Sequence, residues 1–256
     1  MEYWLEQFHV FLLVLLRISA LLIVAPIFGH RLYLARAKIG MAFMISLVVF
    51  PLVVDQGLQV PEGVFPYAFM MVREALMGMV LGFTVLLLFI GIQFAGQLAG
   101  LQMGFGIVNV IDPQSHGQVS IIAQFLNILA VLIVLSIDGH HLILQGLISS
   151  FDAVPLGGVE FKAPIAEKII SLSSQVFGIA IKISAPILIS LLSISVALGV
   201  LARTVPQMNV FIVGFPVQLA VGMSVLVASL PLFQIMLSKA MQLLQRDLMA
   251  LVDFFA

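Results

Sequence analysis

Few residues in this 256-residue chain have the types and spacing that chemistry requires, and the clearest group is Asp138, His140 and His141. Aspartate and histidine are common metal ligands and general bases. Adjacent histidines, however, are expected to point to different faces of a helix, and the remaining histidines offer no partner one helical turn away. We therefore interpret the group as the end of an apolar segment, where Asp138 and Gly139 cap and turn the chain.

Other patterns of catalytic and cofactor sites are missing from the sequence. It contains no H-E-x-x-H, no G-x-S-x-G and no phosphate-binding loop. The absence of cysteine excludes disulfides, thiolate metal sites and cysteine nucleophiles. We predict a protein that is not an enzyme and that uses no metal and no cofactor.

The composition is that of an integral membrane protein or a membrane assembly. Hydrophobic residues make up 62% of the chain and charged residues 9%, against about 25% charged in soluble domains. The net charge of −1 gives no indication of nucleic-acid binding. Because the first apolar segment follows Glu2 and Glu6 rather than positive charge, we expect a retained helix and not a secretory signal.

Four charged residues lie inside apolar segments, namely Arg17, Arg73, Glu74 and Lys182. A charge at the centre of a bilayer costs about 2.5–3.5 kcal/mol on insertion scales. Such residues either relay protons or ions, as in transporters, or pair with one another and with backbone carbonyls inside a helical assembly. We favour buried pairing, because two of the three sites are purely basic whereas a proton or sodium relay would use acidic residues.

The longest uncharged segment runs from Ala75 to Ile111 and is rich in glycine. At about 1.5 Å per residue a helix of this length exceeds the thickness of a bilayer core, so simple spanning does not explain it. Its glycines recur at small-xxx-small spacing, which lets a neighbouring backbone approach one helix face. The predicted packing glycines are Gly78, Gly82, Gly96 and Gly100.

Six apolar blocks indicate an all-α protein with one helical domain, residues 1–256. The last two blocks each exceed one membrane span and contain prolines, so we expect bent or paired helices there. The polar stretch from Asp152 to Lys168 is expected to be a loop. The blocks are Leu5 to Phe28, Ile39 to Val54, Phe65 to about Gly104, Val119 to Ile137, Ile169 to Ala202 and Met208 to Leu237.

Helix signals fail between the third and fourth blocks. Three glycines, several β-branched residues and then Asp112-Pro113 predict a loop whose centre is apolar. Irregular backbone is not tolerated in lipid, so this loop must be buried in protein or line a cavity. It is either a plug for a pore or an ordinary re-entrant turn that packs helices. The residues concerned are Gly104, Phe105, Gly106, Ile107, Val108, Asn109, Val110 and Ile111.

Over nearly its whole length the chain resembles the FliR family of flagellar export-gate proteins and their counterparts in type III secretion injectisomes. No single motif is specific, but their order and spacing together are. The first connector departs from the family pattern, since Tyr33-Leu34-Ala35 stands where the family commonly has a proline. The motifs are Arg17 with Ala25-Pro26-Ile27, Glu74 with Gly78 and Gly82, Gly100 to Gly104 with Asp112-Pro113, Asp138-Gly139-His140, Ser150-Phe151 with Pro155, Pro186, Pro206-Gln207 with Asn209, and Gly214-Phe215-Pro216.

This resemblance implies a subunit of the flagellar export gate in the bacterial inner membrane, at the flagellar basal body. It implies FliP-type and FliQ-type subunits in a hetero-oligomer, an FlhB-type subunit nearby, and unfolded flagellar proteins as export substrates. The family's plug loop maps onto Gly104 to Gly117 here. In such an assembly apolar helices face either lipid or the ring of subunits.

The alternative function is a secondary transporter for a small solute. Helices broken around Pro186 and Pro216 would then form a site near the bilayer midplane. Against it, the chain has no visible inverted repeat and no obvious acidic coupling residue.

Overall fold

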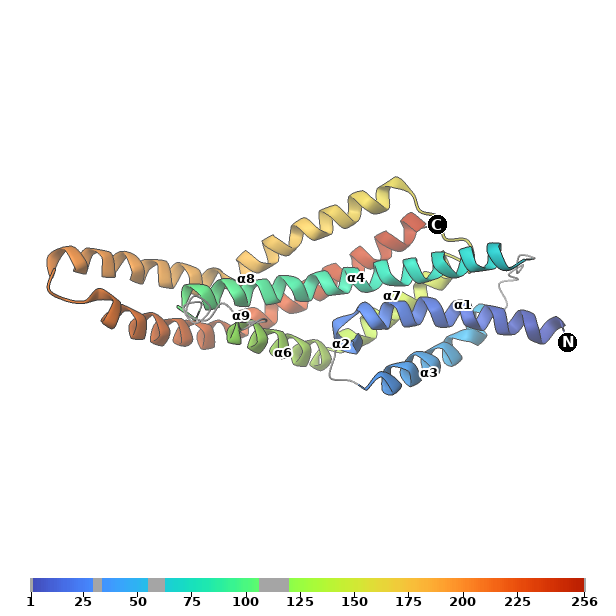
Figure 1. The fold of residues 1–256 in the computed structure, drawn as a ribbon, viewed down its shortest axis with the longest axis horizontal. Coiled ribbons are helices and arrows are strands. Elements are labelled where there is room, and N and C mark those ends of the chain that lie inside the picture. Colours follow the sequence, from blue (N-terminus) through green and yellow to red (C-terminus); the bar gives the residue numbers. More distant parts are fainter. Residues whose placement is uncertain (1, 30–33, 55–62, 106–119, 256) are drawn as a thin grey trace. The chain divides into compact units, whose positions relative to one another are not determined.

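The computed structural model describes residues 2–29, 34–54, 63–105 and 120–255, and in these ranges the chain forms helices and no strand (Figure 1). This confirms the predicted all-α membrane-type fold. The helices are α1 (Glu2–Val24), α2 (Pro26–Gly29), α3 (Ala35–Val53), α4 (Val64–Gln102), α6 (Ile121–Ser136), α7 (Gly139–Ala153), α8 (Ala163–Thr204) and α9 (Val210–Phe255).

The chain divides into two compact units. Unit 1 comprises residues 1–87, 138–173 and 241–256, and unit 2 comprises residues 88–137 and 174–240. The long helices α4, α8 and α9 contribute residues to both units. The single helical domain expected from the sequence remains a prediction.

Unit 1 is built around α1. This helix packs against α2 and α3, and Phe11 meets Phe43 and Phe50 edge to face, with ring centroids 5.5 and 5.8 Å apart. Leu13 of α1 and Met77 of α4 are completely buried. These side chains form an apolar core around the polar centre described below.

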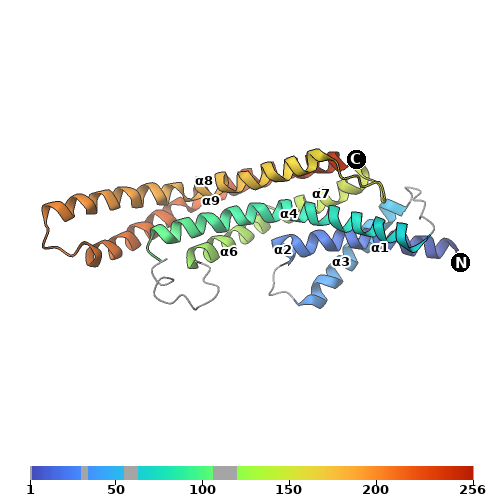
Figure 2. The same ribbon diagram turned by 45° about the horizontal axis from the view of Figure 1, so that its top comes forward.

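Unit 2 contains the end of α4, all of α6, the C-terminal part of α8 and the N-terminal part of α9. Within this unit α8 and α9 run alongside each other in both views (Figures 1 and 2). The serine hydroxyls of α8 donate to their own backbone one turn earlier, as in Ser184 to Ala180 O at 2.8 Å and Ser190 to Pro186 O at 2.8 Å. Such bonds satisfy polar groups that an apolar helix must carry.

Within the described ranges, five helices are long and apolar enough to cross a membrane, namely α1, α3, α4, α8 and α9. The apolar block from Val119 to Ile137 contains the 16-residue α6, which continues through a 71° bend into α7. The bend follows from the left-handed conformation of Asp138, whose φ is 55°. The pair α6–α7 is therefore a broken span or a re-entrant hairpin.

Several elements differ from the sequence expectation. α7 was not expected, and the predicted loop up to Lys168 is shorter because α8 already begins at Ala163. α9 continues well beyond Leu237, to Phe255. The two proline-containing blocks are each one helix, with Pro186 inside α8 and Pro216 and Pro231 inside α9, so the paired-helix option is wrong.

Candidate functional site

A buried ion pair lies in unit 1, between α1 and α4. Arg17 Nε donates to Glu74 Oε2 at 2.6 Å, and both side chains are completely buried. Arg17 Nη1 donates to the carbonyls of Ser150 at 2.9 Å and Val154 at 3.1 Å, at the end of α7. The guanidinium thus joins α1, α4 and α7 through charge-assisted hydrogen bonds.

The carboxylate of Glu74 has a second role. Its Oε1 accepts a hydrogen bond from the backbone N–H of Gly157 at 2.9 Å, in the connection between α7 and α8. The ring of Phe151 lies 4.3 Å from Arg17 Cζ and covers the guanidinium with a cation–π contact. The two charges therefore fix the α7–α8 connection against the core of the unit.

The four predicted buried charges thus divide into different environments. Arg17 and Glu74 are buried together, and Arg73 is half-buried with its Cζ 4.4 Å from the ring centroid of Phe69. The burial of Lys182 in an assembly stays a prediction, but within this chain the residue is exposed in α8. The reason is that Lys182 lies on the side of α8 that is opposite to Ser184 and Leu191, which are buried.

Sequence reasoning missed the backbone part of this centre. The carbonyls of Ser150 and Val154 and the N–H of Gly157 carry no side-chain signal, because any residue type supplies them. The sequence drew attention to this segment only through the motif Ser150-Phe151 with Pro155, one of the motifs that carry the family resemblance.

The first two packing glycines of α4 face α1. A Cβ on Gly78 would collide with the backbone carbonyl of Arg17 and lie 2.9 Å from Ala20 Cβ. A Cβ on Gly82 would lie 2.8 Å from the carbonyl oxygen of Leu21. Glycine at these positions lets α1 approach α4 closely enough for Arg17 to reach Glu74, one turn before Gly78.

The other two packing glycines face the start of α6, in unit 2. A Cβ on Gly96 would collide with the backbone of Ala123, and one on Gly100 with the hydroxyl of Ser120. These close approaches are contacts within this chain and need no second subunit.

The end of α4 forms a Schellman motif. Gly104, with φ of 91°, donates its N–H to Leu101 O at 3.1 Å, and Phe105 donates to Gly100 O at 3.0 Å. Met103 is completely buried and would contact any side chain placed at Gly222 of α9. Of the predicted plug segment, only Gly104 and Phe105 are described; residues 106–111 lie outside the described ranges.

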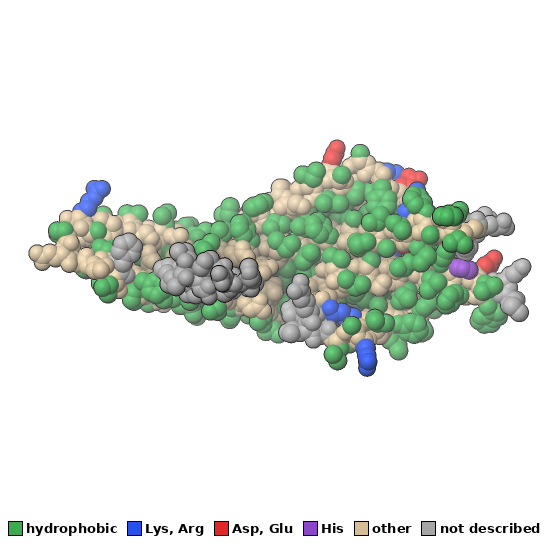
Figure 3. All heavy atoms as spheres, viewed as in Figure 1, with side chains coloured by type: hydrophobic (Ala, Val, Ile, Leu, Met, Phe, Trp, Pro, Cys, Tyr) green, Lys and Arg blue, Asp and Glu red, His purple; other side chains and the backbone are tan. Residues whose placement is uncertain are grey.

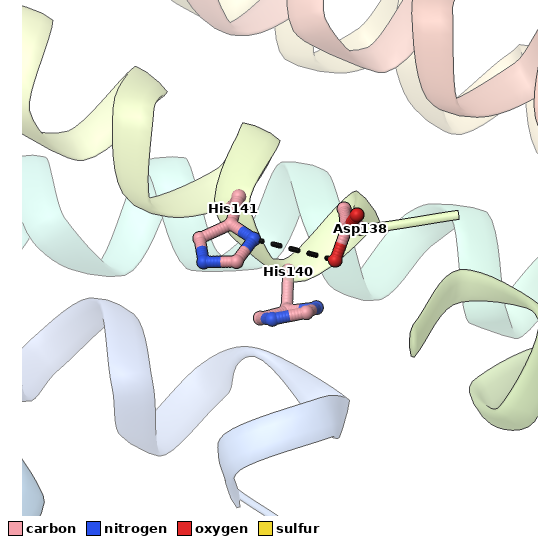
Figure 4. Close-up of side chains that lie close together, drawn as sticks. All are labelled: Asp138, His140 and His141. Carbon is pink, nitrogen blue, oxygen red and sulfur yellow. Dashed lines mark ion pairs between the residues drawn. The ribbon is translucent and has the colours of Figure 1, made fainter. Parts of the chain in front are cut away.

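Asp138, His140 and His141 meet at the bend between α6 and α7 (Figure 4). Their potential ligand atoms lie within 4.8 Å of one another, and the two imidazole rings are 4.2 Å apart. The expectation that adjacent histidines point apart is therefore wrong, because both rings turn toward each other in the first turn of α7. Asp138 stands at the N-cap without a capping bond, and its carboxylate lies 3.5 Å from His141 Nδ1.

Comparison with known proteins identifies the family of this chain. Residues 8–244 match the model of bacterial export proteins, family 1. The flagellar biosynthetic protein FliR of Bacillus subtilis (strain 168) is 37% identical, over 96% of this chain and 97% of the relative. The FliR proteins of Escherichia coli (strain K12) and Aquifex aeolicus (strain VF5) are 33% and 31% identical, over 90% and 93% of this chain and 88% and 92% of the relatives.

The chain belongs to the FliR family of bacterial export proteins.

The structure brings together several FliR-like motifs that lie far apart in the sequence. Arg17, Glu74 and Gly78 meet between α1 and α4, and Ser150-Phe151 from α7 joins them. The motif Asp138-Gly139-His140 lies at the α6–α7 bend. In this FliR-family chain the motifs that contain Arg17, Glu74 and Ser150-Phe151 therefore share one polar centre in unit 1.

Proposed function

We propose that this chain is a subunit of the flagellar type III protein export gate and helps to form and plug the pore through which flagellar proteins cross the inner membrane. The main support for the proposal is the family match over residues 8–244. The relatives named above are flagellar biosynthetic proteins, which adds to this support. It favours protein export over transport of a small solute, and the chain has no enzymatic part in it.

In this proposal the chain works inside a hetero-oligomer at the flagellar basal body. FliP-type and FliQ-type subunits surround it, an FlhB-type subunit lies nearby, and unfolded flagellar proteins pass through. Support comes from the apolar surface of α8 and α9, in whose most apolar stretches only 17% of the residues are buried (Figure 3). Such a surface must be covered by lipid or by other subunits.

We assign the plug to the segment from Gly104 to Ile111. The Schellman motif at Gly104 ends α4 sharply and directs the chain out of the helix, and the following residues are mostly apolar. An apolar segment without a regular hydrogen-bond ladder seals a pore by excluding water and ions, and yields to a passing chain.

Shortening this segment tests the plug. Removal of Ile107 to Val110 is expected to leave the complex assembled but to make membranes that contain it leak ions. Conductance is measured across planar bilayers with the wild-type and the shortened complex, after assembly of both has been confirmed by size-exclusion chromatography. Equal and low conductance from both complexes would assign the seal to other subunits.

A further inference from the structure

The middle of α8 carries an isolated charge. Lys182 is the only charged residue between Ile169 and Ala202. At about 1.5 Å per residue this run is about 50 Å long, well beyond the roughly 30 Å of a bilayer core. Lipid alone therefore cannot cover the whole run.

The environment of Lys182 differs from that of the other central cation. Arg17 is neutralised within the chain by Glu74. Lys182 is exposed, and in the described part of the chain it forms no ion pair and no hydrogen bond. In addition, Pro186 lies four residues after Lys182 in α8 and has no N–H. The backbone carbonyl of Lys182 therefore does not accept the usual helical hydrogen bond from that position.

The residues around Lys182 form a regular stripe on the outer side of α8. They recur at alternating intervals of four and three residues, the spacing with which one helix packs along another. Ile189, Leu192 and Val196 are 66%, 60% and 62% exposed. The stripe consists of Gly178, Lys182, Ala185, Ile189, Leu192, Val196 and Gly199.

The ends of this Gly178–Gly199 stripe are open. Among the described residues, no heavy atom lies within 4 Å of the position that a Cβ would occupy on Gly178 or on Gly199. The opposite side of the helix, with Ala180, Ile187 and Leu191, is buried within the chain. Glycines whose open side meets no described residue leave room for another backbone to approach, and packing against lipid does not require such room.

We propose that the Gly178–Gly199 stripe docks a helix of a partner subunit that carries apolar residues at the same spacing and one Asp or Glu opposite Lys182. A carboxylate neutralises the lysine in the apolar contact, where an unpaired charge is costly. A single lysine in such a stripe also sets the register of the two helices, because only one alignment places the opposite charge beside it. This inference rests on the proposed function, since it names the contact chemistry for one of the export-gate partners.

The test uses the complex co-expressed with the FliP-type and FliQ-type subunits of the same genome. Lys182→Glu is expected to lower the amount of co-purified partner at least about tenfold, because two carboxylates then face each other. Lys182→Arg keeps the charge and is expected to retain assembly. Lys162→Glu, a charge reversal in the exposed connection before α8, is the matched control.

A photo-crosslinking amino acid at Ile189 gives a second measurement that leaves Lys182 intact. It is expected to capture a partner helix with an acidic residue in register with Lys182, and changing that residue to lysine should restore assembly of Lys182→Glu. A probe at Leu201, exposed away from the stripe, serves as the control.

Two negative results have different meanings. If the wild-type chain does not co-purify with these subunits, the proposed function is wrong and this contact falls with it. If the wild-type assembles but Lys182→Glu assembles equally well, or if Ile189 crosslinks only to lipid or to a second copy of this chain, the contact alone is wrong.

Discussion

The guanidinium of Arg17 has hydrogen-bond acceptors from separate parts of the sequence around it. Glu74 supplies a carboxylate, and Ser150 and Val154 supply carbonyls. Each acceptor replaces part of the hydration shell that the charge loses on burial. Glu74 therefore pairs with Arg17 within this chain, whereas Arg17 Nη2 is buried without a hydrogen-bond partner among the described residues.

We expect Arg17→Ala to destabilise the chain by about 3–5 kcal/mol, because it leaves the Glu74 carboxylate buried without its counter-charge. The double variant Arg17→Met with Glu74→Leu is expected to be more stable than Arg17→Ala, since it removes both charges. Thermal unfolding of the purified complex in detergent measures both effects.

The control for this prediction is Arg73→Ala, which removes a half-buried cation from the face of Phe69. Its effect is expected to be small, because exposed cation–π contacts are worth about 0.5–1 kcal/mol. An unfolding midpoint of Arg17→Ala equal to that of Arg73→Ala would contradict the structural role of the ion pair.

At the scale of the element, α4 carries glycine at four close approaches to its neighbours. Two approaches are to α1 and two are to Ser120 and Ala123 at the start of α6. The glycine spacing thus positions α4 against two different helices along its length. A larger side chain would push the backbones apart rather than fill a space.

We expect Gly100→Leu to block assembly of the complex while membrane insertion survives. The change adds about four heavy atoms where Ser120 contacts α4. We expect it to displace the start of α6 within this chain, and thereby to distort the subunit that its partners must bind, while the helix stays apolar. Co-purification with the partner subunits measures assembly, and membrane fractionation measures insertion.

Gly40→Leu is the matched control, because no atom lies within 4 Å of a Cβ at Gly40 in α3. If Gly100→Leu co-purifies as well as Gly40→Leu does, the close approach at Gly100 has no role in assembly.

At the scale of the whole molecule, many large hydrophobic side chains of the described residues are exposed rather than packed against other parts of the chain. Large hydrophobic side chains are exposed along α3, α8 and α9, and hydrophobic side chains are spread over the visible face (Figure 3). Monomeric soluble proteins rarely expose such continuous apolar areas. Either lipid or partner subunits must therefore contact this apolar surface.

We therefore expect the chain expressed alone to be unstable or polydisperse, and to become stable only with partner subunits. The reasons are the exposed apolar helices and the unpaired Lys182. Native mass spectrometry of the chain purified alone and of the co-expressed complex compares the two states. A stable, monodisperse monomer would argue against an obligate role in an assembly.

The sequence by itself determined the helical membrane class, most helix positions and the glycine-rich end of α4. These features follow from local hydropathy and from the backbone preferences of glycine and proline, which act over a few residues. It predicted that the chain turns at Asp138 and Gly139, but it did not reveal the helix α7 that follows, because this segment is less apolar than α6.

Only the tertiary structure decided which charges are buried. Arg17 is 57 residues from Glu74 and 133 residues from Ser150, so no local pattern links them. Lys182 looks equally central in its apolar segment, yet it lies on the outer side of α8. A hydropathy pattern shows only that a charged residue lies in an apolar segment. The environment of that residue depends on which distant carboxylates and carbonyls the fold places beside it.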